Sequence, residues 1–264
     1  MSEIFKLYNY IFDSRKYLLE MLEDRGYDVS HLKDYTHDEM NVMINEHNNG
    51  KFRGLAEVGP LDIVLEKKST SLGIGIDKTS DKTIDEITTS LNSIKLEDKQ
   101  KLSKDVSTEK IYVKYRLDPK FKKTASLTEQ ITDIFTNLLT TKDTLIILNV
   151  CRVLMKAGVK DKTDEEFGNN LFVTKKYFVQ LFGLENFLFN VSRHQFVPKH
   201  RILSKKETHD LLEKYNCNIT NIPTIKRDDV QAKYIGLRPH QICEITVDNV
   251  TSGNTVRYRL CVTN

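Results

Sequence analysis

Apolar residues recur at helical spacing at the start of the chain, and Gly26 follows them where a helix C-cap would lie. We therefore predict a first helix that ends near Arg25. Thr36 and Glu39 have the spacing of a capping box ahead of a second apolar pattern, and the Asn-Asn-Gly cluster at 48–50 ends it. This predicts a second, short helix. The apolar residues of the first pattern are Ile4, Leu7, Tyr8, Ile11, Leu18 and Leu22.

The next apolar segments favour strands. Residues 61–65 and 111–117 have the composition of strands, and the alternation in the second predicts one buried face. Ser126 and Glu129 form another capping box ahead of a helical pattern, which leads to the apolar run 145–150. A strand, an amphipathic helix and a strand in this order predict an α/β sheet with a crossover helix on one face.

One long stretch interrupts this pattern. Residues 67–108 are dominated by Ser, Thr, Lys and Asp, so we interpret most of them as a mobile insertion. After the charged stretch 160–166, the aromatic and leucine positions in 177–182 suggest a helix, and 187–191 a short strand.

The C-terminal part has clear local signals. Ser204 and Glu207 predict a capped helix, and the segments 242–247 and 255–262 predict paired strands with a turn at 252–254.

Length and pattern together predict two domains, 1–190 and 191–264. The fold class is mixed α/β (α+β), with an α/β sheet in the first domain and a small mixed domain after it. Charge follows the same division. Residues 190–264 hold 12 Lys and Arg against 7 Asp and Glu, or +5, whereas the preceding part holds 28 against 30, or −2. A solvated surface and a face for an acidic partner or nucleic acid explain this equally well.

Composition argues against membrane and disulfide-dependent classes. The chain is 39% hydrophobic, and no run approaches the length of a membrane span. The N-terminus has no secretory signal, so we interpret the cysteines as reduced. No cysteine pair has C-x-x-C spacing, which argues against zinc.

One stretch resembles a nuclease centre. Asp62, Glu66 and Lys68 have the residue types of the metal-binding core of restriction-type nucleases. Only three residues separate the two carboxylates, so both leave one face of one strand and cannot converge on Mg²⁺ from two directions. A solvated strand end is the preferred interpretation, and a metal-dependent nuclease on the N-terminal domain stays the alternative.

Other chemical motifs are incomplete. Gly73 and Gly75 begin like a dinucleotide loop, but the third glycine is missing. His194, His200 and His209 lack the i, i+4 spacing of a metal pair, so structural or interfacial roles are preferred. There is no Gly-x-Ser-x-Gly elbow either. We expect no catalytic, cofactor-binding or metal residue.

Short motifs in the C-terminal part carry a family resemblance. Residues 194–200 (HQFVPKH) followed by 202–204 (ILS) resemble the H-x-L-V-P-x-H signature of an assembly domain, and further motifs follow in order: 222–225, Asp229, 232–236, Gln241, Gly253 and 256–260. The chain thus resembles the fifth subunit shared by eukaryotic DNA-dependent RNA polymerases and, over its C-terminal part, the shorter archaeal counterpart of that subunit. Upstream, 15–16 and 24–27 resemble the first helix of the eukaryotic jaw domain.

The resemblance implies a noncatalytic polymerase subunit. Its expected parts are a jaw domain with a nuclease-like fold but no active site, and an assembly domain packed on the largest subunit. The expected subunit-interface residues are His194, Val197, Pro198, His200, Pro223, Asp229, Tyr234, Gly236, Gln241, Tyr258 and Arg259. Tyr258 and Arg259 alternate on the last strand, so Tyr258→Ala should unfold the domain and Arg259→Ala should chiefly weaken assembly.

Departures from the family pattern limit what carries over. Val230 replaces the usual proline and Pro239-His240 replaces the residues before Gln241 where glycine is usual, so the family's loop conformation is not transferred there. Residues 151–167 are longer than their counterpart and lack the proline of the eukaryotic loop nearest downstream DNA, so no DNA contact is transferred to any one residue. Downstream duplex DNA would be contacted through its backbone, without base reading. Only Lys156, Lys160 and Lys162 are candidates for that contact.

The expected partners are the largest polymerase subunit, the other polymerase subunits and downstream DNA, with no membrane and no cofactor. The richness in Lys, Asn and Ile and the absence of Trp suggest the AT-rich genome of a large DNA virus. The expected location is therefore the nucleus or a viral factory, with packaging in the virion as a further option. A transcription regulator that binds polymerase only transiently is the third hypothesis.

Overall fold

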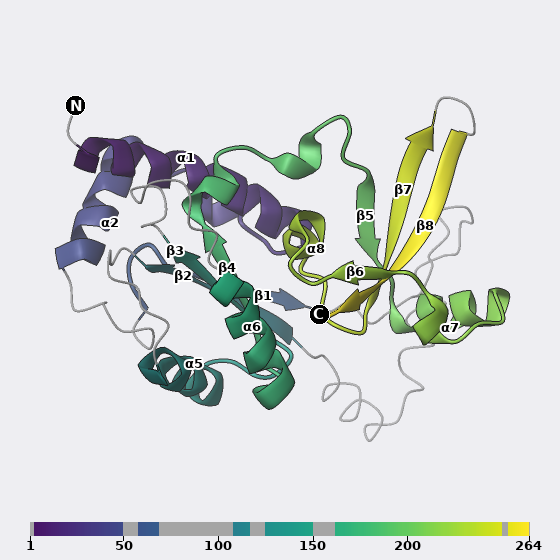
Figure 1. Ribbon diagram of the computed structural model, residues 1–264. Coiled ribbons are helices and arrows are strands. Elements are labelled where there is room, and N and C mark those ends of the chain that lie inside the picture. Colours follow the sequence, from purple (N-terminus) through teal and green to yellow (C-terminus); the bar gives the residue numbers. More distant parts are fainter. Residues whose placement is uncertain are drawn as a thin grey trace, which may run out of the picture.

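The structure is a computed structural model that describes residues 3–49, 58–68, 108–116, 125–149, 162–249 and 253–263 (Figure 1). Nearly all of the predicted insertion, with Gly73 and Gly75, lies outside these ranges, as does Cys151. Within them, no helix is long and apolar enough to cross a membrane.

The N-terminal sheet has the strand order β1-β2-β3-β4. β1 pairs with β2 in antiparallel fashion, whereas β2, β3 and β4 run parallel, with α5 and α6 in the connections. The predicted crossover of strand, helix and strand is therefore confirmed. The elements are β1 (Ile63–Lys68), β2 (Thr108–Arg116), α5 (Ala125–Asn137), β3 (Thr144–Asn149), α6 (Lys162–Lys175) and β4 (Phe178–Gly183).

Helices cover both faces of this sheet (Figure 1). On one face α1 (Glu3–Asp24) and α2 (His37–Asn49) pack on Ile111, Val113 and Tyr115 of β2. On the other, α5 and α6 pack on Tyr112 and on β3. The prediction of one buried face for β2 is wrong, because a second helical layer covers the polar positions of its alternation as well.

The predicted ends of the first two helices are confirmed. Gly26 has a φ of 87° and follows α1, where its N–H donates to Glu23 O at 2.8 Å. Thr36 and Glu39 form the capping box of α2: the N–H of Thr36 donates to the Glu39 carboxylate at 2.8 Å, and the N–H of Glu39 to Thr36 Oγ1 at 3.4 Å. These local signals fix where each helix begins or ends.

Three local predictions are wrong. Residues 177–182, predicted as a helix, mostly form β4, because a short apolar run buried on both faces has no period that separates strand from helix. The expected strand at 187–191 is replaced by two 3₁₀ turns, Leu184–Phe187 and Val191–Arg193. Ser126 lies inside α5 instead of at its N-cap, since α5 begins at Ala125.

The C-terminal sheet has the order β5-β7-β8-β6. β7 and β8 form the predicted antiparallel hairpin, which projects away from the rest of the chain in Figure 1. Ser204 and Glu207 form the predicted capping box of α7. The elements are β5 (Lys199–Ile202), α7 (Lys205–Lys214), β6 (Thr224–Lys226), α8 (Val230–Ile235), β7 (Ile242–Asn249) and β8 (Gly253–Val262).

Two mixed sheets with helices confirm the predicted α/β (α+β) class. The N-terminal sheet ends at Gly183 and the C-terminal one begins at Lys199, so the predicted boundary at 190/191 falls between them. The boundary itself stays a prediction.

Candidate functional site

Arg25 lies at the junction of the two sheets, just after α1. Its guanidinium donates to Lys233 O at 2.6 Å, to Tyr234 O at 2.9 Å and to Gln180 Oε1 at 2.9 Å. Two of these acceptors are carbonyls at the C-terminal end of α8, where a cation is favoured by the helix dipole. Burial lowers the pKa of Arg25 to about 10. The side chain therefore ties α8 to the N-terminal core.

Gly236 makes this approach possible. It ends α8 in the left-handed region, with a φ of 73°. A Cβ at this position would lie 3.3 Å from Arg25 Cζ. Both the backbone conformation and the space beside Arg25 thus favour glycine here.

Cations from the C-terminal sheet also cover β4, the edge strand of the N-terminal sheet. Arg227 donates to Val179 O, and Lys233 Nζ donates to Leu181 O at 2.8 Å. The residues are two apart in the strand, so their carbonyls leave the same edge. Capping them protects an edge that would otherwise be open to another strand.

Arg238 makes a third link across the junction. Its guanidinium donates to the carbonyls of Thr141, Lys142 and Asp143 in the turn before β3. It also lies over the Phe178 ring, 4.8 Å from the centroid. Burial lowers the pKa of Arg238 as well.

Tyr234 closes the junction on the α1 side. Its hydroxyl donates to Asp24 Oδ2 at 2.6 Å and accepts from Asn190 Nδ2 at 3.1 Å. Arg193 donates to the other oxygen of Asp24 at 3.0 Å. Burial and the hydrogen bond to Asp24 raise the pKa of Tyr234. The two sheets are therefore joined by a network of side chains, many of whose acceptors are backbone carbonyls.

Several predicted interface residues serve this chain's own structure. Asp229 is the N-cap of α8 and accepts from the N–H groups of Gln231 and Ala232. Gln241 Oε1 accepts from Arg238 N at 2.9 Å. Tyr234 and Gly236 belong to the junction described above. A subunit-interface role for these four stays a proposal, beside a structural role that the geometry supplies.

The other predicted interface residues reach the surface to different degrees. His194 and Pro223 are exposed. Val197, Pro198, His200, Tyr258 and Arg259 are half-buried, and a ring nitrogen of His200 lies 2.8 Å from Pro198 O. Of the DNA candidates, Lys156 and Lys160 lie outside the described residues, and Lys162 is the first residue of α6.

Of the cations at the junction, Arg227 and Arg238 lie in none of the sequence motifs, whereas Lys233 lies in the motif 232–236. Arg227, Lys233 and Arg238 belong to the basic surplus of the C-terminal part, but surplus charge alone does not separate buried from solvated cations. Arg25 lies in the segment 24–27 that carried the resemblance. That motif was the one available signal for it.

The side chain of Asp62 is buried, so the prediction of a solvated strand end is wrong for Asp62, whereas Glu66 is exposed as predicted. One carboxylate oxygen accepts from Lys114 Nζ at 2.7 Å and Gly59 N at 2.6 Å, and the other accepts from Tyr115 N at 2.8 Å. Glu66 lies on the surface and pairs with Lys110 at 2.7 Å. Asp62 and Glu66 thus make separate contacts, and the Asp62 oxygens already have donors. This geometry opposes the nuclease alternative.

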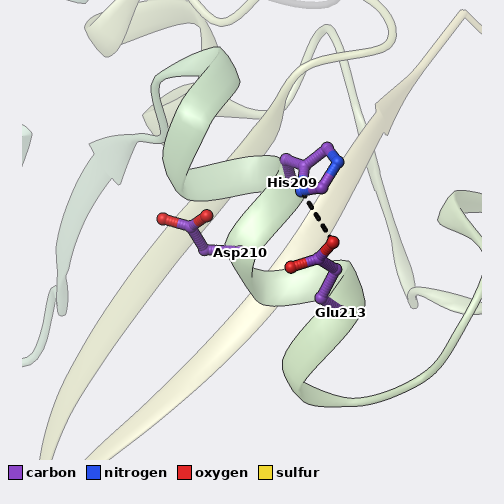
Figure 2. A group of neighbouring side chains, drawn as sticks. All are labelled: His209, Asp210 and Glu213. Atoms are coloured by element: carbon purple, nitrogen blue, oxygen red, sulfur yellow. Dashed lines mark ion pairs between the residues drawn. The ribbon is translucent and has the colours of Figure 1, made fainter.

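Figure 2 shows the one group of possible metal ligands in the described part of the chain, His209, Asp210 and Glu213 on α7. His209 Nδ1 lies 3.5 Å from Glu213 Oε1, one helical turn away. All three residues are exposed. An exposed pair one turn apart is an ordinary feature of a solvated helix, and we assign no metal site here.

Comparisons with known proteins match mainly the C-terminal sheet and the segment leading to it. The model of the family "RNA polymerase Rpb5, C-terminal domain" matches residues 189–261. The chain is 43% identical over 74 residues to DNA-directed RNA polymerase subunit Rpo5 of Archaeoglobus fulgidus, covering 28% of this chain and 97% of that protein.

Eukaryotic relatives are matched over a smaller share of their length. The chain is 36% identical over 88 residues to the rpabc1 subunit of DNA-directed RNA polymerases I, II and III of Dictyostelium discoideum, covering 33% of this chain and 45% of that protein. It is 27% identical over 110 residues to RPABC1 of Caenorhabditis elegans, covering 42% and 51%. The chain thus spans about half the length of these relatives.

The archaeal match covers nearly the whole of that protein. The residues matched by the family model contain β5 to β7 with their capped helices and all but the last residue of β8. The chain belongs to the Rpb5 family of DNA-directed RNA polymerase subunits.

Proposed function

We propose that this chain acts as a noncatalytic structural subunit of a DNA-directed RNA polymerase, and that its C-terminal sheet packs on the largest subunit. The observation that carries the proposal is the match of the family model to residues 189–261, together with a 74-residue match that covers 97% of an archaeal polymerase subunit. A protein that consists of little else must make its subunit contacts through this unit. The buried Asp62 supports the absence of a nuclease activity.

The N-terminal sheet would act as a jaw beside downstream duplex DNA. The network at Arg25, Arg227 and Arg238 supports this role, because a rigid junction would hold the jaw at a fixed angle to the docked C-terminal sheet. Contact with DNA would run through phosphates, would fall with salt and would read no bases. Lys156, Lys160 and Lys162 stay the candidate residues for it.

The source and location are part of the same proposal. The eukaryotic relatives are subunits of polymerases I, II and III, and a nuclear location fits them. The absence of Trp and the richness in Lys and Asn support a large DNA virus as the source, with a viral factory or the virion as the alternative location.

A tagged pulldown from the native source at high salt tests the proposal. We expect the two largest polymerase subunits to co-purify at about one to one with the tagged chain, since obligate interfaces survive salt that removes surface charge contacts. Mass spectrometry identifies the partners and their stoichiometry. Recovery at low salt only would favour the transient regulator, and recovery of the chain alone would contradict both.

A further inference from the structure

The outer edge of β8 is open over half of its length. β6 pairs with β8 only at residues 260–262, and the chain shortly before β6 forms the 3₁₀ turn Ile219–Asn221. The N–H of Leu260 donates to Pro223 O, at the start of the pairing with β6. Residues 254–258 face no further strand among the described residues.

The hydrogen-bonding groups along this edge can be assigned. The N–H of Cys261 donates to Gln241 O on the β7 side, whereas the N–H of Leu260 points to the β6 side. Because these directions alternate along an antiparallel pair, the N–H and C=O groups of Asn254, Val256 and Tyr258 point outward. They form an edge of roughly 14 Å on which another strand can pair.

A groove of about 400 Å³ follows the same edge. One wall is β8, and the other comes from the end of α7 and from residues 221–223. Tyr215, which is 58% exposed, and Val256, which is 46% exposed, supply apolar surface to it. Tyr215 and Tyr258 make an edge contact with ring centroids 6.3 Å apart. The groove is therefore suited to apolar side chains.

The two faces of β8 differ in charge. On the face of Tyr258, Arg201 already pairs with Glu207 at 2.6 Å and with Glu244 at 3.2 Å. Arg257 and Arg259 lie on the opposite face by strand alternation, and both line the groove. Neither guanidinium has an ion pair with a carboxylate in the part of the chain that the structure describes. The positive charge on this face is left for a partner.

We infer that the outer edge of β8 at residues 254–258 binds an extended acidic segment of another polymerase subunit, which adds a strand to the C-terminal sheet. Its apolar side chains lie beside Tyr215 and Val256, and its carboxylates face Arg257 and Arg259. The inference rests on the proposed function and adds the binding mode and the chemistry of the partner segment.

The test uses the tagged full chain in its native source at about 0.15 M salt, where contacts between exposed charges are not fully screened, with recovery of the two largest subunits as the readout. Val256→Pro removes an outward N–H while leaving the pairing with β7, and Val256→Thr keeps that N–H as the control. The variant Arg257→Glu/Arg259→Glu reverses the charge on the face of β8 opposite Tyr258, and Lys205→Glu/Lys206→Glu makes the same change on exposed residues of α7. A melting curve of each variant checks its fold.

We expect Val256→Pro and the double arginine variant each to lower recovery by about tenfold or more, and both controls to stay within about twofold of wild type. Full recovery with either test variant, at unchanged melting temperature, overturns the inference and leaves the proposed function standing. If the wild-type chain recovers no polymerase subunit, the proposed function fails and the inference falls with it.

A photo-crosslinking residue at Asn254 gives a second readout that does not depend on the fold of a proline variant. A crosslink to an acidic, extended segment of a polymerase subunit supports the inference. A crosslink within this chain shows that the edge is occupied in cis and overturns it, as does a crosslink to a basic or helical segment.

Discussion

The N-terminal sheet has helices on both faces, whereas the C-terminal sheet ends in a hairpin with an open outer edge. The difference extends to their charges. Lys114 and Asp62 pair inside the N-terminal core, and the cations that cover the β4 edge are held by backbone carbonyls. Arg257 and Arg259 have no ion pair in the described part of the chain. The charges named in the first region hold the fold together, whereas these two arginines are the ones for which we infer a role in binding.

The largest effect should come from Asp62→Ala. The substitution leaves Lys114 buried without its carboxylate and takes the acceptor from Tyr115 N, so we expect a loss of about 3–5 kcal/mol in the free energy of unfolding. Urea denaturation of the variant and of the surface control Glu66→Ala measures it. A loss below about 1 kcal/mol, matching the control, would contradict a structural role for this carboxylate.

Arg25→Met should have the next largest effect. Methionine keeps apolar volume but gives no donor to Lys233 O and Tyr234 O, and each buried acceptor left unpaired costs about 1–3 kcal/mol. We expect a loss of about 2–4 kcal/mol in total and earlier proteolysis between the two sheets. Arg193→Met, on an exposed pair with Asp24, is the matched control. Equal losses in the two variants would show that burial is not the deciding feature.

Tyr258→Ala should have a moderate effect on stability. The sequence predicted that this change unfolds the domain, but Tyr258 packs at the margin of its apolar cluster and is half-buried. We therefore expect a loss of about 1–2 kcal/mol. Arg259→Ala should change stability by less than about 0.5 kcal/mol while lowering polymerase recovery. If the two variants had the same melting temperature and the same polymerase recovery, the assignment of stability to the Tyr258 face and of binding to the Arg259 face would be contradicted.

The smallest effect should be a dependence on pH in the N-terminal region. Burial lowers the pKa of His47 below its ordinary value of 6.5, so the unfolded chain binds this proton more readily than the folded chain. The free energy of unfolding then has its full value above about pH 6.5 and declines as the pH falls below it, because protonation of His47 favours the unfolded chain. Denaturation at about pH 7.5, 6 and 5 measures the slope, with His47→Gln as the control. A slope that persists unchanged in His47→Gln would assign it to other groups.

Much of the C-terminal sheet could be predicted from local residues. The capping box at Ser204 and Glu207 and the hairpin at 242–262 depend on neighbours a few positions apart, and the structure confirms both. Residues 177–182 were mistaken for a helix because they form a strand covered on both sides. The alternation of apolar and polar residues that marks a strand is lost when both of its faces are buried against a helix or a neighbouring domain.

The sequence by itself determined the family, the α/β class and the starts of α2 and α7, because each rests on short motifs in register. Only the tertiary structure decided which charges are buried. Asp62 meets Lys114 from 52 positions away, and Arg25 meets Lys233 O from 208 positions away. The environment of a charge depends on what packs around it, so an arginine is buried and hydrogen-bonded to backbone carbonyls at position 25 but exposed at position 257.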